Sequence, residues 1–199
     1  MTEKKENANS SAEEKAAGRT PQGEKKAASE KGAAEEKGSE TAVSIPAVNP
    51  QLEGFLRSMQ SKYASLEIVP DPHIVKVKIE GHELVRFLEE LKHAAEWKMD
   101  LLLDITAVDY KEYFSLVYVL SSLSYGHRIM VKCNINDYGN PITYSISHIY
   151  PAAEVMEREV YDLMGIDFWG HPHLERILLP EDFIGHPLRK DFKAGTGSS

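Results

Sequence analysis

The stretch LLLDITAVDYKEYFSLVYVLSSLSYGHRIMVKCNI, residues 101–135, contains three runs rich in β-branched, aliphatic and aromatic residues. The runs are Leu101–Val108, Tyr113–Leu123 and His127–Ile135, and short polar segments join them. Short connections join antiparallel neighbours, whereas parallel strands need a crossover of about a dozen residues or more. This stretch therefore predicts a meander of three antiparallel strands.

Two further extended runs, Glu67–Val69 and His73–Glu80, precede this stretch. In the second run Val75, Val77 and Ile79 alternate with two lysines, which predicts a strand with one buried face and one exposed face. We expect the two runs to form a half-exposed hairpin.

Two amphipathic helices are predicted around the hairpin. Asn49 and Pro50 suit the cap and first position of a helix, and the apolar residues that follow share one helical face. A second helix is predicted after Gly81 on the same grounds. The two apolar stripes are Leu52, Phe55, Leu56, Met59 and Tyr63, then Leu84, Phe87, Leu88, Leu91 and Ala95.

These elements predict an α+β fold of two layers, with a mixed or antiparallel sheet and flanking helices. We divide the chain into a disordered N-terminal tail at 1–45, the α+β domain at 46–150, and a helix plus extended C-terminal arm at 151–199. The tail prediction rests on residues 1–42, which contain no Val, Ile, Leu, Phe, Tyr, Trp or Cys to bury.

The composition of the chain argues against several classes of function. The 199 residues include 31 acidic and 23 basic ones, which disfavours binding to the phosphates of nucleic acid. The single cysteine, Cys133, cannot by itself hold an iron–sulfur cluster. No apolar run approaches the roughly 20 residues of a membrane span. No secretory or mitochondrial targeting pattern is found at the N-terminus, so we expect a bacterial or archaeal cytoplasmic protein.

Beyond Pro151 the sequence changes character. Ala152–Met164 predicts a helix that Gly165 closes in the left-handed conformation. From Asp167 to Lys193 the chain is dense in Pro, Gly, His and charge, with few apolar residues for a core of its own. We expect a partner chain to order this arm.

Two other interpretations of this region start from its titratable residues. His171, His173 and His186 suggest a zinc hydrolase with Glu157 as the base, although the spacing is weak as a zinc signature. Alternatively, the helix charges form ordinary surface pairs, with Arg158 between Glu154 and Asp162.

The region from Glu157 to Asp191 carries a more specific pattern. Residues 157–166 read EREVYDLMGI, and Phe168, Gly170-His171-Pro172, Leu174, Arg176-Ile177-Leu178, Pro180-Glu181 and Gly185–Asp191 follow. Together with Thr106–Tyr110 and Pro151–Ala153, this pattern resembles the 30 kDa subunit of respiratory complex I, the proton-pumping NADH:quinone oxidoreductase. The resemblance covers most of residues 50–193.

The resemblance implies a subunit without a cofactor or active site of its own, with Fe–S clusters, FMN and quinone in partner subunits. It implies that the arm wraps the quinone-site subunit beside the terminal Fe–S subunit, peripherally on the cytoplasmic side of the inner (plasma) membrane. The matching residues are then expected at the partner interface: Glu157, Arg158, Glu159, Asp162, Gly170, His171, Pro172, Arg176, Pro180, Gly185, His186, Pro187, Leu188, Arg189, Lys190 and Asp191.

The sequence departs from the family pattern in two places. Val155-Met156 replaces an aromatic pair, and Met164 replaces a Phe. Related subunits occur in membrane-bound hydrogenases and in ferredoxin-linked or deazaflavin-linked dehydrogenases, so these branches stay open as alternatives.

Overall fold

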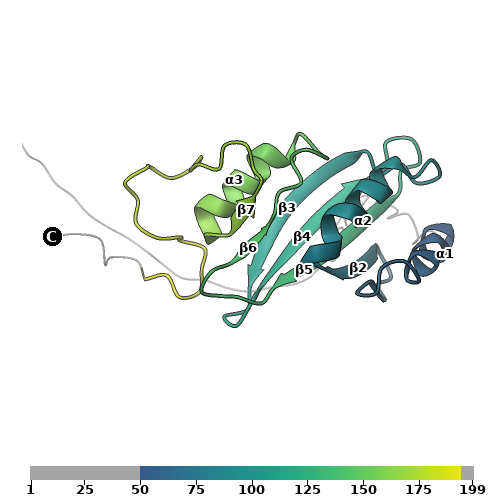
Figure 1. The fold of residues 1–199 in the computed structure, drawn as a ribbon, viewed down its shortest axis with the longest axis horizontal. Helices are drawn as coiled ribbons and strands as arrows, with labels where there is room; N and C mark the ends of the chain where they lie inside the picture. Colours follow the sequence, from purple (N-terminus) through teal and green to yellow (C-terminus); the bar gives the residue numbers. More distant parts are fainter. Residues whose placement is uncertain (1–49, 194–199) are drawn as a thin grey trace, which may run out of the picture. The chain divides into compact units, whose positions relative to one another are not determined.

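The structure is a computed structural model that describes residues 50–193 (Figure 1). The predicted tail at 1–45 and the predicted capping residue Asn49 lie outside the described residues. The helices are α1 (Pro50–Met59), α2 (Gly81–His93) and α3 (Ala153–Met164). The strands are β1 (Glu67–Val69), β2 (Val75–Glu80), β3 (Leu101–Asp109), β4 (Phe114–Ser121), β5 (Arg128–Ile135), β6 (Ile142–Tyr144) and β7 (Asp167–Trp169).

The main sheet has five strands in the order β1-β2-β5-β4-β3. Strands β3, β4 and β5 form the predicted antiparallel meander, and β1 and β2 form the predicted hairpin. The hairpin joins the meander where β2 pairs with β5 in parallel, so the sheet is mixed. The predicted α+β fold with a mixed sheet and flanking helices is confirmed.

One face of this sheet carries the hydrophobic core. Val77 of β2 aligns with Val131 of β5 and, through it, with Tyr118 of β4, and all three side chains are buried. Helix α2 lies across this face, and its predicted stripe is fully buried at Leu84, Phe87, Leu88 and Leu91 (Figure 1). Ala95, also predicted for this stripe, lies beyond the end of the helix and is exposed. The apolar residues that alternate along β2 thus lie on the face of the sheet that helix α2 covers.

Helix α3 belongs to the same core. Val160, Met164, Ile166 and Phe168 pack in one cluster with the residues of the main sheet. As predicted, Gly165 ends the helix with φ +68°, and its amide donates to the carbonyl of Tyr161 at 2.8 Å.

The short strands β6 and β7 were not predicted. They pair in parallel, with Thr143 opposite Phe168, and each is only three residues long. Strands this short have no readable periodicity. Their pairing holds the segment after α3 against the segment that follows the main sheet.

Candidate partner interface

The C-terminal arm, residues 167–193, is tied to helix α3 by one buried carboxylate. Oδ2 of Asp162 accepts hydrogen bonds from the backbone amides of Ile177, Leu178 and Leu179 at 3.1, 2.8 and 2.9 Å. Its Oδ1 accepts from Nη1 of Arg176 at 2.6 Å. The Asp162 side chain is fully buried, so four donors replace the water that it loses.

Two arginines complete this contact. Nη2 of Arg176 donates to the carbonyl of Gly185 at 3.0 Å, which links the first and second halves of the arm. Arg158 on α3 donates to the carbonyls of Glu175 and Arg176, each at 3.1 Å. Both guanidinium groups therefore order the arm's backbone.

The donors around Asp162 also set its pKa. Burial alone would raise the pKa of a carboxyl group, because it disfavours the charged form. The amides of residues 177–179 and the Arg176 guanidinium outweigh burial and lower the pKa of Asp162 to about 2. The carboxylate at the base of the arm therefore stays ionised until the pH falls toward 2.

A second carboxylate, Asp109 at the end of β3, anchors the far end of the arm. It is buried, and it accepts from the amide of Lys190 at 2.7 Å and from the hydroxyl of Tyr138 at 3.0 Å. Its other oxygen accepts from the amide of Lys111 at 2.6 Å. Burial opposes these donors, yet together they lower the pKa of Asp109.

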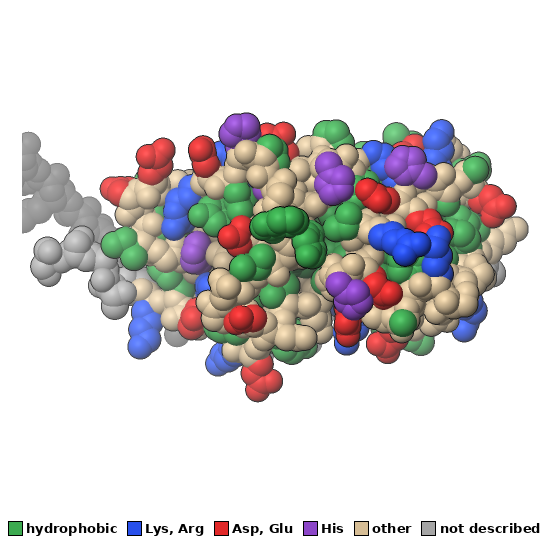
Figure 2. Space-filling view, in the orientation of Figure 1, with side chains coloured by type: hydrophobic (Ala, Val, Ile, Leu, Met, Phe, Trp, Pro, Cys, Tyr) green, Lys and Arg blue, Asp and Glu red, His purple; other side chains and the backbone are tan. Residues whose placement is uncertain are grey.

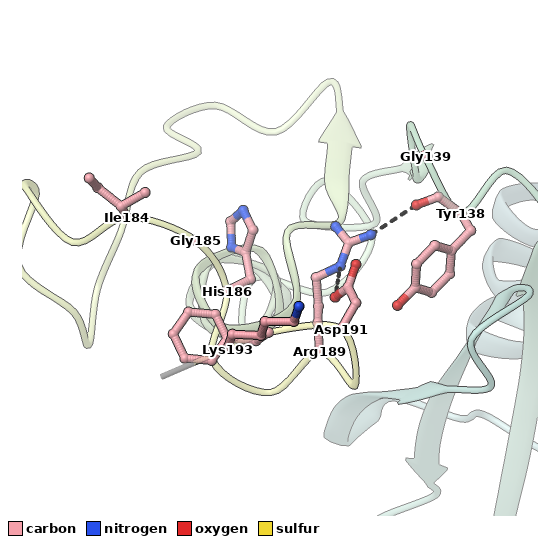
Figure 3. Close-up of a pocket in the computed structure, with 9 residues that line it drawn as sticks. Tyr138, Gly139, Ile184, Gly185, His186, Arg189, Asp191 and Lys193 are labelled. Atoms are coloured by element: carbon pink, nitrogen blue, oxygen red, sulfur yellow. Dashed lines mark hydrogen bonds and ion pairs between the residues drawn. The ribbon is translucent and has the colours of Figure 1, made fainter. Parts of the chain in front are cut away.

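Arg189 lies beside this second anchor. Its guanidinium stacks 4.8 Å from the ring centre of Tyr138 and 5.0 Å from that of Phe114, and donates to the carbonyl of Tyr138 at 2.9 Å. Figure 3 shows it between Tyr138 and Asp191, whose carboxylate lies 3.4 Å from Nε. Arg189, Tyr138 and Asp191 line an open depression of about 560 Å³.

Glu157, on the buried side of α3, is held differently from Asp162. Its carboxylate is fully buried and accepts from the Ser145 hydroxyl at 2.6 Å and from the Ile146 amide at 2.7 Å. Burial outweighs these two donors and raises the pKa of Glu157 to about 7. No guanidinium of the described residues compensates this carboxylate as Arg176 compensates Asp162.

Gly165 provides the room in which the arm folds back on α3. A Cβ atom at this position would lie 2.5 Å from Cδ2 of His186, and the positive φ already disfavours any other residue. Nδ1 of His186 lies 3.0 Å from the carbonyl oxygen of Asp162. Gly165 therefore both ends helix α3 and leaves space for the ring of His186.

We expect Gly165→Ala to destabilise the chain by about 1–2 kcal/mol from backbone strain alone, and further because the His186 ring must move. Adding His186→Ala removes the steric part, so the double variant should be more stable than the sum of the single effects predicts. Urea unfolding of the four proteins measures this. Additive effects would show that the ring contact does not matter.

Comparison with known proteins places this geometry in a family. Residues 77–197 match the family described as "Respiratory-chain NADH dehydrogenase, 30 Kd subunit". The chain belongs to this 30 kDa subunit family. The corresponding NADH-quinone oxidoreductase subunit of Moorella thermoacetica is 40% identical over 147 residues, which cover 73% of this chain and 97% of the relative. That of Trichlorobacter lovleyi is 37% identical and covers 69% and 86%.

A solved structure is also similar. It is a chain of the membrane-bound sulfane sulfur reductase, described as an archaeal respiratory membrane complex. The TM-score is 0.63 with 31% sequence identity, and the match covers 72% of this chain and 86% of that one. The resemblance to the 30 kDa family stated from the motif residues is thereby confirmed.

The structure brings most of the expected interface residues of this 30 kDa family member together around α3 and the arm. Seven are exposed: Glu159, Gly170, Pro172, Pro180, Leu188, Lys190 and Asp191. Seven are half-buried: Arg158, His171, Arg176, Gly185, His186, Pro187 and Arg189. Glu157 and Asp162 are fully buried.

Three expectations need correction. The carboxylates of Glu157 and Asp162 cannot serve directly as acceptors for a partner, because groups of this chain already use them. The predicted surface pairing of Arg158 with Glu154 and Asp162 is not formed, because Arg158 binds arm carbonyls instead. A partner chain was expected to order the arm, but its backbone also contacts its own domain, at Glu175–Leu179 and at Lys190.

The histidines suggested for a zinc site do not converge. Nε2 of His171 lies 2.9 Å from the carbonyl of Glu154, and its Nδ1 accepts from the amide of His173 at 3.1 Å. His186 contacts Asp162, and Glu157 contacts Ser145. Within residues 50–193 no three His, Cys, Asp or Glu side chains are placed to hold a metal ion.

Sequence reasoning expected Leu188 at the interface but missed other apolar residues that this region exposes, among them Trp169, Leu178 and Ile184. Trp169 is 68% exposed and packs edge-on against Tyr144, with ring centres 5.4 Å apart. Leu178, Ile184 and Leu188 of the arm are 59%, 79% and 59% exposed. Hydrophobic side chains gather at the surface around the middle of the view in Figure 2. In a sequence, such residues look the same as core residues.

Proposed function

We propose that this chain is a non-catalytic peripheral-arm subunit of a membrane-bound, proton-translocating NADH:quinone oxidoreductase. In this proposal it holds the quinone-site subunit against the terminal Fe–S subunit, and electrons pass through those neighbours. One observation carries the proposal: the arm's backbone is fixed from within while its large apolar side chains point outward. A surface of that kind is suited to binding another protein.

The way the arm is fixed favours tight assembly. Ordering a segment of about twenty residues at the moment of binding would cost conformational entropy. Asp162 and Asp109 bind the arm before any partner arrives, at Ile177–Leu179 and at Lys190. The apolar side chains of the arm then project from a backbone that is already ordered.

The proposal assigns the redox groups, Fe–S clusters, FMN and quinone, to the partner subunits. Cys133 is buried, and burial, with a contribution from the charge of Glu80, raises the pKa of its thiol to about 12, which does not favour a thiolate ligand. None of the helices between residues 50 and 193 is long and apolar enough to cross a bilayer. We propose a peripheral place on the cytoplasmic side of a bacterial or archaeal inner membrane.

Trp169→Ala tests this proposed interface. A pull-down with the tagged full chain from solubilised membranes should recover a multisubunit redox assembly, and Trp169→Ala should reduce the recovery about tenfold or more, since buried tryptophans dominate interface energies. Its own unfolding should change little. Leu123→Ala is the matched control, because Leu123 is 72% exposed in the turn between β4 and β5. Equal recovery of the two variants would contradict the proposal.

A second candidate from the same lineage is favoured by the likeness to the sulfane sulfur reductase complex. This chain would then be the equivalent subunit of a membrane-bound hydrogenase, or of a ferredoxin-linked or deazaflavin-linked dehydrogenase. The recovered partners distinguish the two candidates. A flavin subunit with a dinucleotide motif indicates NADH as donor, whereas a large subunit with nickel-ligating cysteine pairs indicates a hydrogenase.

A further inference from the structure

The main sheet has a second face that no described helix covers. Helix α2 contacts β2 and β5, and α3 contacts β3. All three helices pack into the core: α2 through its buried apolar stripe, α1 through Leu52 and Leu56, and α3 through Val160 and Met164. The side chains of the opposite face, which we name the open face, form two central rows across β2, β5, β4 and β3: Lys76, Met130, Val119 and Asp104, then Lys78, Lys132, Val117 and Thr106.

The charges of the open face are not balanced at its centre. Lys78 and Lys132 are directly opposite each other on the parallel strands β2 and β5. Like charges at opposed positions destabilise a sheet. Glu67 stands opposite Lys78 on β1, and Glu80 follows Lys78 on the same face of β2. Neither Lys78 nor Lys132 forms an ion pair with any described residue. Lys76, by contrast, is paired with Asp71.

Beside these lysines lies an apolar strip. Val117 is buried, with 7% of its surface exposed, Val119 and Met130 are half-buried, and Val108 at the edge is 40% exposed. The three strands β5, β4 and β3 span about 10 Å from first to last, at about 4.8 Å between neighbours. An α-helix with its side chains is about 10–12 Å wide. The strip therefore has the width of one helix.

We propose that the open face binds an amphipathic helix of a second polypeptide, with carboxylates flanking its apolar stripe. The apolar stripe would cover Val119 and Met130, and the carboxylates would neutralise Lys78 and Lys132. This charge complementarity selects an acidic partner even though the chain itself has a net charge of −8. The site is separate from the arm and does not depend on the arm's partner.

Photo-cross-linking within the assembled complex tests this proposal. A benzoylphenylalanine residue replaces Thr106, which is exposed on the open face, in the full chain produced in its native membranes. The expected product joins this position to an acidic helical segment of another polypeptide, identified by mass spectrometry. Lys78→Glu with Lys132→Glu should lower its yield about tenfold, and the corresponding glutamine pair should lower it less.

Arg57→Glu with Lys98→Glu is the matched control, because both residues are exposed away from the open face. This pair should leave the yield unchanged. Thermal melts of all variants verify folding. Cross-links to residues 1–49 of the same chain, to a second copy of this chain, or to nothing would each overturn the proposal. Loss of the complex on Trp169→Ala, by contrast, concerns only the arm.

Discussion

Replacing Asp162 with asparagine should release the C-terminal arm from helix α3. The substitution keeps the shape of the side chain but removes the charge that four donors share. Arg176, whose side chain is only 18% exposed, then keeps a positive charge without its counter-ion. Breaking a buried ion pair on one side costs about 3–5 kcal/mol.

Hydrogen exchange measures this release. A loss of about 3 kcal/mol corresponds to exchange about a hundredfold faster at the amides of Ile177, Leu178 and Leu179. Asp182→Asn, at an exposed position of the arm, is the control and should leave these amides protected. If Asp162→Asn and Arg176→Gln are combined, the loss should be smaller than the sum of the single losses. Unchanged exchange at 177–179 would contradict the anchoring role of Asp162.

Replacing Glu157 with glutamine should remove a pH dependence of the whole fold. The pKa of Glu157 is raised from 4.5 to about 7 in the folded chain, so the folded state binds a proton more tightly than the unfolded state. Its contribution to stability is therefore fully present below about pH 4.5 and is lost as the pH rises to 7. At about 1.4 kcal/mol per pKa unit, the loss amounts to about 3 kcal/mol.

Glutamine stays neutral and can accept from the Ile146 amide while its NH₂ donates to Ser145. Glu157→Gln should thus match the natural chain at pH 4.5 and exceed it by up to about 3 kcal/mol at pH 8. Urea unfolding across this range measures the difference between the two proteins. Glu159→Gln, on the exposed side of the same helix, controls for the lost charge. A difference that does not grow between pH 4.5 and 8 would refute this account of Glu157.

Asp162 and Glu157 therefore act with opposite sign on the same helix. The pKa of Asp162 is lowered to about 2, so its contribution is present above about pH 4 and is lost as the pH falls toward 2. The Glu157 contribution is lost as the pH rises toward 7. Low pH should therefore weaken the contact of Asp162 with the arm, and high pH should weaken the contact of Glu157 in the core.

Local patterns predicted much of this fold. Alternation in β2 and helical spacing in α2 identified the buried sides correctly, because a single buried face imposes a period on the sequence. Gly165 was predicted to close α3 because few other residues adopt its backbone conformation. Parallel pairing of β2 with β5 joins segments about fifty residues apart, and no local signal encodes it.

For the candidate site, the sequence suggested residues but not the contacts between them. Asp162 binds amides about fifteen residues further along an arm without periodicity, so the sequence could not tell an internal acceptor from one facing a partner. Trp169 and Leu178 were missed because the type of an apolar residue does not show whether its side chain is buried or exposed. The Asp109 contact spans eighty-one positions and is likewise visible only in three dimensions.

The most direct test of the scaffold role separates assembly from turnover. Membranes carrying the Trp169→Ala chain are solubilised, and the amount of assembled complex and its NADH:quinone activity are measured together. We predict less assembled complex, with unchanged turnover for each complex that does assemble. Full assembly with turnover lost would contradict the account, because the arm would then belong to a reaction centre.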